Sequence, residues 1–213
     1  SPSISPISPC QPRSAASGSG ISACLVRYKA VELLIPLQRR LLHEIGQRTL
    51  GSEFYLTGGT ALAAFYLQHR FSVDLDLFTA NPSAVARAPH MMQEIAAKLN
   101  LEITFTRTLS TFLECFIVSS TGEQVEFDFA QDSPFRLEPT HQHPELGIQI
   151  DSFTDIACNK LSALFDRAEP KDFVDVYFVV QERMPFDQLV RLTRQKHLGI
   201  DDYWLAVALS QVT

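Results

Sequence analysis

Hydrophobic positions at helical spacing open the globular part of the chain. They run from residue 33 to residue 45 and predict a helix, with Pro36 limiting where that helix can begin. Residues 53–57 have the pattern of a short strand that two glycines stop, and residues 60–69 have that of a second helix. Residues 73–79 alternate between apolar and acidic positions, which is typical of a half-buried strand. This half of the chain therefore mixes helices with strands.

The pattern stays mixed as far as about residue 150. Asn81 and Pro82 suit the N-cap and the first position of a helical stretch that ends near residue 99, and Pro89 is a point at which it can break. Three further strands are predicted at residues 101–106, 112–118 and 124–129. A polar loop at residues 131–144 follows them.

Helical patterns dominate after residue 150. Ser152 and Asp155 form a capping box for a helix that reaches about residue 167. Pro170 opens another helix to about residue 183, and two shorter helices follow. The sequence predicts an α+β protein in which a mixed sheet with flanking helices occupies residues 21–150 and a helical extension occupies residues 151–213.

Residues 1–20 differ from the rest in composition. Thirteen of these twenty residues are Ser, Pro or Gly, and Arg13 is their one charged residue. Such a segment buries too little apolar surface to offset the entropy of ordering it, so we expect a disordered tail.

Composition and charge exclude some classes of protein. The longest apolar run has seven residues, Ala61 to Leu67, far below the ~18 that a membrane span needs, so no membrane partner is expected. The net charge of −6 argues against a protein that coats nucleic acid through its overall field. The four cysteines are widely spaced and form no C-x-x-C pair, which favours reduced thiols in a cytoplasmic protein.

The first candidate for chemistry is the turn Gly58-Gly59-Thr60, between a predicted strand and a predicted helix. Backbone N–H groups in such a turn can point at an anion, and glycine has no Cβ to keep a phosphate away. Taken alone, the same residues are explained by a tight connection between strand and helix.

Acidic residues on two predicted strands are the second candidate. Asp74 and Asp76 are two residues apart, so on a strand both project from one face. Glu126 and Asp128 repeat this spacing on a later strand. An amphipathic strand with its acids in water explains each pair by itself. If the two strands are neighbours, however, the carboxylates converge beside the glycine turn, and a metal ion is their natural counter-charge.

These runs resemble a known family. The glycine turn followed by Asp74-Leu75-Asp76-Leu77-Phe78 is similar to the signature of AbiEii/AbiGii-type nucleotidyltransferases, within the DNA polymerase β-like superfamily. A later run, Lys160-Leu161-Ser162-Ala163-Leu164 with Arg167, Lys171-Asp172 and Asp175-Val176-Tyr177, resembles the second conserved block of that family. The resemblance covers about residues 50–180.

The resemblance implies a role for each matching residue. Two Mg²⁺ ions would be held by Asp74 and Asp76, with Asp128 as the third carboxylate and Glu126 as its alternative. Lys160 would approach the triphosphate as a catalytic residue. The residues that would bind the nucleotide are Gly58, Gly59, Thr60, Arg70, Lys160, Asp172 and Asp175.

The implied protein is a Mg²⁺-dependent enzyme with a minimal polymerase β-like core. It would move a nucleoside monophosphate from an NTP to an acceptor hydroxyl on RNA, such as a tRNA, or on a protein. It would be the toxin of a bacterial toxin–antitoxin or phage-defence pair, with a cognate antitoxin as partner. The alternative is a nucleotide-binding regulatory or partner-binding module that has lost catalysis. An intact pair of Asp74 and Asp76 argues against that alternative, because a protein that only binds has no need to keep both.

Overall fold

The computed structural model describes residues 33–211, so the tail predicted at residues 1–20 lies outside the described residues. The helical elements are α1 (Pro36–Gly46), η2 (Leu50–Glu53), α2 (Gly58–Leu62), η3 (Ala63–Leu67), α3 (Ala84–Leu99), α4 (Phe153–Arg167), α5 (Pro170–Glu182), α6 (Phe186–Lys196) and α7 (Asp202–Leu209). The strands are β1 (Tyr55–Thr57), β2 (Leu75–Thr79), β3 (Glu102–Thr108), β4 (Phe112–Val118), β5 (Gln124–Gln131), β6 (His141–Gln142) and β7 (Gln149–Ile150).

The strands form one mixed sheet in the order β3-β4-β5-β2-β1-β7-β6. β2 runs parallel to β5 and antiparallel to β1, while β4 runs antiparallel to both β3 and β5. The predicted α+β class is confirmed. β2 and β5, which carry the two acidic pairs, are direct neighbours although about fifty residues separate them in the chain.

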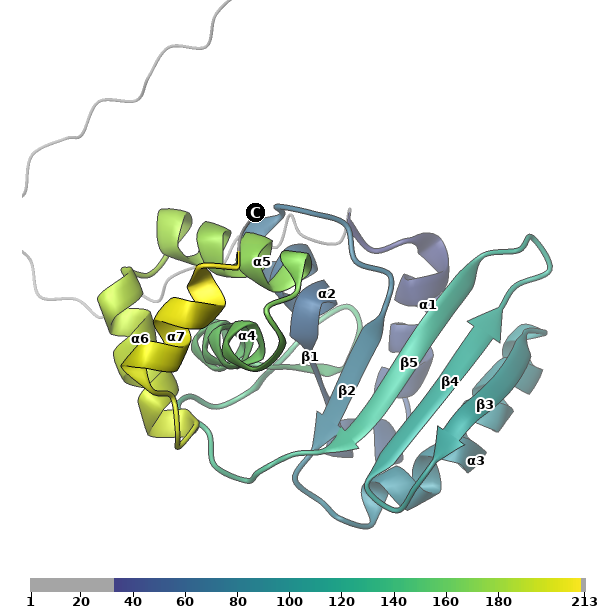
Figure 1. Cartoon of the computed structure of the whole chain (residues 1–213). Helices are drawn as coiled ribbons and strands as arrows, with labels where there is room; N and C mark the ends of the chain where they lie inside the picture. Colours follow the sequence, from purple (N-terminus) through teal and green to yellow (C-terminus); the bar gives the residue numbers. More distant parts are fainter. Residues whose placement is uncertain (1–32, 212–213) are drawn as a thin grey trace, which may run out of the picture.

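Alternation along the central strands decides which face of the sheet is buried. Leu75, Leu77, Phe127 and Phe129 are fully buried, and the acidic residues between them point to the other face. Figure 1 shows α1 and α3 behind the sheet, where they cover the apolar face, and the helices α4 to α7 beside β1 and β2. In this view none of the described helices lies over the front of β3, β4 and β5.

Several elements differ in detail from the sequence prediction. α3 runs through Pro89 without a break. β2 begins at Leu75, so Asp74 lies just before the strand and not on it. The turn at Gly58 passes directly into α2, which continues as the π-helical η3 to Leu67. The loop after β5 contains the short strand β6.

The N-cap predicted at Ser152 is confirmed, but the Asp155 carboxylate bonds the Ser152 hydroxyl, so only one half of the predicted capping box forms. Ser152 is the N-cap, its Oγ accepts a hydrogen bond of 2.9 Å from Asp155 N–H, and it donates one of 2.7 Å to the Asp155 carboxylate. The same carboxylate accepts hydrogen bonds from two backbone N–H groups of the loop before β6 and from Lys196 Nζ. Asp155 therefore ties the start of α4 to that loop and to the end of α6.

Two further expectations concern cysteines and membranes. Cys115 and Cys158 are buried as free thiols, and Cys10 and Cys24 lie outside the described residues. Between residues 33 and 211, none of the helices combines the length and the apolar character that crossing a membrane requires.

Candidate active site

The site is built around the turn between β1 and α2. Gly58 has φ +69°, a conformation that residues with a Cβ adopt only at a cost. A Cβ at this position would also lie 1.9 Å from Asp76 Oδ2, so the side chain of Asp76 fills the space that glycine leaves. Glycine is thus required here both by the backbone conformation and by the close approach of the Asp76 carboxylate.

The next two residues of the turn hold other parts of the site. A Cβ on Gly59 would lie 2.5 Å from Arg70 Nη2, so the guanidinium packs against the glycine backbone. The buried hydroxyl of Thr60 donates a hydrogen bond to the backbone carbonyl of Asp74. Thr60 therefore positions Asp74 and, unlike the two glycines, does not line the cleft.

A buried glutamine that the sequence prediction missed holds the same loop from the other side. Gln38 on α1 is fully buried, and its Nε2 donates hydrogen bonds to the carbonyls of Ser72 (3.1 Å) and Val73 (2.9 Å). Hydrogen bonds from Gln38 and Thr60 therefore fix the backbone carbonyls of the three residues that precede β2.

Carboxylates from three adjacent strands gather on the open face of the sheet. Asp76 on β2 is opposite Asp128 on β5, and Asp128 is opposite Glu114 on β4. Oxygens of Glu114, Glu126 and Asp128 all lie within 4.8 Å of one another, which makes them a group that could hold a metal ion among the described residues. Asp76 faces this group from the neighbouring strand.

The electrostatics of the acidic group show that its members repel one another. Burial, followed by the charges of Asp76, Glu114 and Asp74, raises the pKa of Asp128 to about 6. Burial also raises the pKa of Asp76, and the charge of Asp74 adds to this rise while that of Lys160 opposes it. Asp128 Oδ1 is buried and has no hydrogen-bond partner. A cation at this place would satisfy that oxygen and remove the repulsion.

A group of cations faces the carboxylates, and buried aspartates hold it in place. Asp175 is fully buried and accepts hydrogen bonds from Arg70 Nε (2.6 Å), Arg70 Nη2 (2.9 Å) and His69 Nε2 (2.7 Å). Lys160 Nζ lies 2.8 Å from Asp175 Oδ2, the oxygen that also accepts from Arg70 Nη2. Burial alone would raise the pKa of Asp175, but these partners hold it well below its usual range.

Asp172 has the same role at the preceding turn of α5. It is fully buried and accepts two hydrogen bonds from Arg167, at 2.7 Å from Nε and 3.0 Å from Nη2. Lys160 Nζ lies 3.7 Å from it. The resemblance implied that Asp172 and Asp175 bind the nucleotide, but neither lines the cleft. Their carboxylates lie behind the cations, where direct contact with a phosphate would also be repulsive.

These groups meet in one cleft of about 740 Å³ between the sheet and the C-terminal helices. The predicted residues that line it are Gly58, Gly59, Arg70, Asp74, Asp76, Glu126, Asp128 and Lys160. Arg167, Lys171 and His197 also line it. The cleft therefore has a cationic wall formed by α4, α5 and the loop after η3, and an acidic wall formed by the sheet.

The sequence prediction did not include Glu114, and it named Lys171 in a motif without giving it a role. Glu114 has no motif of its own and joins the acidic group only because β4 pairs with β5. The alternation of Phe112–Val118 could have identified it as a residue on the open face. Lys171 lines the cleft from the first turn of α5, beside Glu169 at 3.3 Å.

Solved structures share this fold. JHP933 from Helicobacter pylori superposes with a TM-score of 0.55, at 18% identity, over 75% of this chain and 71% of that one. MenT4, a nucleotidyltransferase toxin from Mycobacterium tuberculosis, superposes with a TM-score of 0.54, at 20% identity, over 75% of this chain and 62% of that one. These similarities show that the chain has the fold of the MenT4 nucleotidyltransferase.

The sequence identifies the family. Residues 40–202 match the profile of the AbiEii nucleotidyl transferase toxins of type IV toxin–antitoxin systems, which covers well over half of the chain. An uncharacterized protein of Aquifex aeolicus is 31% identical over 165 residues, 77% of this chain and 76% of its own. The chain belongs to the AbiEii family of nucleotidyltransferase toxins.

Proposed function

We propose that this nucleotidyltransferase is Mg²⁺-dependent and moves a nucleoside monophosphate from an NTP to an acceptor hydroxyl. The observation that carries the proposal is the single cleft in which the Gly58-Gly59 turn and Lys160 face Asp74, Asp76 and Asp128. A triphosphate needs positive charge and N–H donors, and a metal needs carboxylates. This cleft offers both on opposite walls.

The acidic wall fits a divalent cation by its own chemistry. Carboxylate oxygens are the ligands that Mg²⁺ prefers, and the buried, unpartnered Oδ1 of Asp128 together with the raised pKa values of Asp76 and Asp128 supports a missing positive charge. Asp74, Asp76 and Asp128 would hold the metal, with Glu126 and Glu114 next to them. Bound there, Mg²⁺ would offset the acidic charge and polarise the phosphoryl oxygens of the nucleotide.

The residues of the chain would supply the other components of the reaction. Arg70 and Lys160 would bind the β- and γ-phosphates and stabilise the pyrophosphate that leaves, since buried Asp175 holds both side chains at the cleft. The metal-held carboxylates Asp74, Asp76 and Asp128 would orient the acceptor hydroxyl, whose oxygen attacks the α-phosphate in line and displaces pyrophosphate.

The family supports an antitoxin partner, whereas the acceptor is our proposal. A toxin of a toxin–antitoxin system implies a cognate antitoxin, and an RNA such as a tRNA is the acceptor that we propose, with a cellular protein as the alternative. No described helix lies over the front of β3, β4 and β5 in the view of Figure 1, and Asp128 is on β5, so we propose that a macromolecular acceptor approaches from this side. A cytoplasmic location remains a prediction from the cysteines.

The test is transfer of label. The protein is incubated with each α-³²P-labelled NTP, Mg²⁺ and either total RNA or total cell protein, and the products are separated on a gel. We expect one acceptor class to become labelled, and we expect EDTA to abolish the labelling. Nucleotide binding without any labelled product would instead support a module that has lost catalysis.

Variants connect the activity to the cleft. Asp76→Asn should lower the rate of transfer by about 100-fold or more, because it removes one of the carboxylates that would hold the Mg²⁺. Lys160→Ala should lower kcat/KM for the nucleotide by about 10–1000-fold. Lys98→Ala is the matched control, since Lys98 pairs with Glu44 on the far side of the sheet and does not line the cleft. Full activity of Asp76→Asn would refute the metal assignment.

A further inference from the structure

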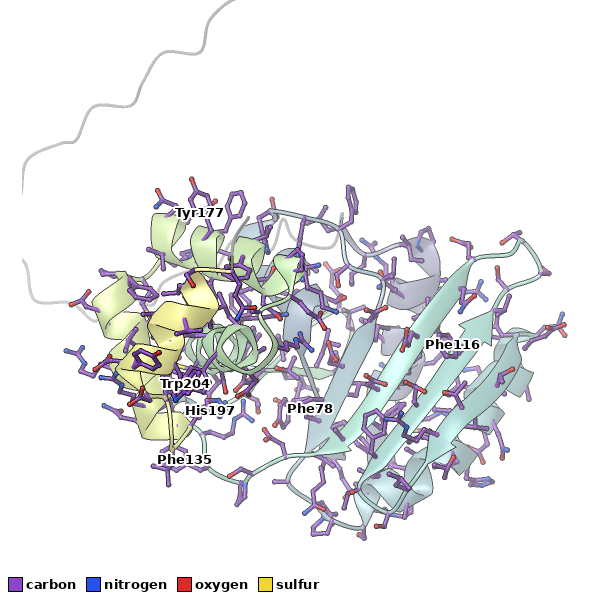
Figure 2. All side chains as sticks on the ribbon, viewed as in Figure 1. Phe78, Phe116, Phe135, Tyr177, His197 and Trp204 are labelled. Carbon is purple, nitrogen blue, oxygen red and sulfur yellow. The ribbon has the colours of Figure 1, made fainter. Side chains whose placement is uncertain are left out.

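The cleft continues past the acidic residues to an end that the proposed chemistry does not use. Phe78 lies two residues beyond Asp76 on β2, on the same face of the strand and therefore about 7 Å further from the glycine turn. Asp132, Ile156, Asn159 and His197 line the same cleft as Phe78. Figure 2 labels Phe78 on the sheet side and His197 on the side of the C-terminal helices.

Helix α4 connects this end with the phosphate-binding end. Lys160 points to Asp175 on α5, whereas its neighbour Asn159 contacts His197 after α6. Consecutive residues of a helix point about 100° apart, so one turn of α4 presents a cation to one end of the cleft and an amide to the other. An NTP with its phosphates beside Lys160 would extend past Asp76 toward Phe78 and Asn159.

The contact between Asn159 and His197 fixes the polarity of the amide. His197 Nε2 lies 3.0 Å from Asn159 Oδ1, and because a carbonyl oxygen only accepts, Nε2 must donate its proton. Burial, with the charge of Lys196, lowers the pKa of His197, so the ring is neutral at pH 7 and keeps this single donor. With Oδ1 engaged, Asn159 offers a ligand its Nδ2 group, which is a donor.

Asp132, a further polar residue that lines the cleft, is already engaged. One oxygen of Asp132 accepts a hydrogen bond from the hydroxyl of Tyr55, and the other accepts one of 2.7 Å from the backbone N–H of Ser133. Phe78 is half-buried and presents an apolar ring beside them. The end of the cleft therefore combines a ring for stacking with one uncommitted donor.

Resting on the proposed function, we propose that this end of the cleft is the base subsite: Phe78 stacks on the base of the NTP, and the Asn159 amide, held by His197, reads the edge of that base. On the edge farthest from the ribose, UTP and GTP carry a carbonyl group. CTP and ATP carry an amino group at the corresponding position. A donor distinguishes these two groups.

The test measures binding of non-hydrolysable analogues of the four NTPs, and of inorganic tripolyphosphate, to the full chain with Mg²⁺. Asn159→Asp replaces the donor by an acceptor. It should shift the affinity ratio within each pair toward the amino-bearing nucleotide by about tenfold. Asn100→Asp makes the same change of charge at the C-cap of α3 and should leave the ratios unchanged. Phe78→Ala should weaken all four NTPs and leave tripolyphosphate binding unchanged.

The outcomes separate this inference from the proposed function. If NTPs and tripolyphosphate bind, but Asn159→Asp leaves both ratios as they were, the base subsite is wrong and the phosphate site stands. If Asn159→Asp changes only the KM of the acceptor in the transfer assay, this end of the cleft binds the acceptor and the inference is likewise overturned. If neither the NTPs nor tripolyphosphate bind, the proposed function falls together with it.

Discussion

Removing one charge from the acidic wall should stabilise the fold while it removes a metal ligand, and Asp128→Asn tests both. Asp128 faces Asp76 and Glu114 across neighbouring strands, and its pKa rises from 3.8 to about 6. A rise of that size corresponds to about 3 kcal/mol at neutral pH. Because the carboxyl is only half-buried, we expect solvent screening to reduce this destabilisation of the folded state to about 1–2 kcal/mol. Asparagine has the same shape and no charge.

The sign of the pH dependence follows from the raised pKa. The folded protein binds a proton at Asp128 more tightly than the unfolded chain does, so the destabilisation is fully present above pH 6 and disappears below about pH 3.8. Without metal at pH 8, Asp128→Asn should raise the free energy of unfolding by about 1–2 kcal/mol. This gain corresponds to about 2–8 °C in Tm for a chain of this size. The gain should shrink as the pH is lowered from 6 to 4.

Urea unfolding with and without Mg²⁺ is the assay. Mg²⁺ at 100 times its Kd should stabilise the wild type by about 2.7 kcal/mol and the variant by much less. Glu102→Gln removes an acidic charge from an exposed position at the start of β3, and it should change neither the stability nor the response to Mg²⁺. If Asp128→Asn is less stable than the wild type at pH 8 without metal, the carboxylates do not repel one another and the argument for a cation at this place fails.

Two further predictions concern the glycine turn and the aspartate behind the cations. Gly58→Ala should abolish transfer and reduce the free energy of unfolding more than Gly122→Ala does. Both glycines have positive φ, but only the new Cβ at Gly58 would meet a side chain, that of Asp76. Equal losses of stability in urea unfolding, with transfer retained, would contradict this. Asp175→Asn should reduce stability at pH 7 and lose this effect as the pH falls below about 4. The pKa of Asp175 is lowered, so its contribution is present above the pKa of the unfolded state and is lost in acid; a loss that persists unchanged into acid would refute it.

The sequence was sufficient for the fold class and for most of the residues in the cleft. Alternation on residues 73–79 and 124–129 placed the acids on one face, and the turn at Gly58 lies next to them as predicted. These features are local, because a period of two and a glycine turn can be recognised within a few residues. The sequence could not show that β2 and β5 are neighbours, because strand order depends on contacts between residues far apart in the chain.

The residues that sequence reasoning missed or placed differently depend on tertiary contacts. Glu114 enters the acidic group through strand pairing, and Gln38 reaches the loop before Asp74 from a helix 34 residues earlier. Asp172 and Asp175 occur in the expected motif, yet their carboxylates face the cations and not the cleft. A motif shows that residues act together, but it does not show which of them touches the ligand.

The arrangement of opposite charges explains why such a cleft can exist in a folded chain without its ligands. On the cationic wall, buried carboxylates hold three of the charges, so Arg70, Lys160 and Arg167 keep their positions. On the acidic wall, Asp76 and Asp128 have raised pKa values, and Asp128 retains a buried oxygen without a partner. The cationic wall is therefore preorganised for a polyanion. The acidic wall is destabilised by repulsion between its carboxylates, which a bound cation would remove. Because a nucleotide triphosphate brings its metal with it, one binding event would satisfy both walls, and the variants above separate the two contributions.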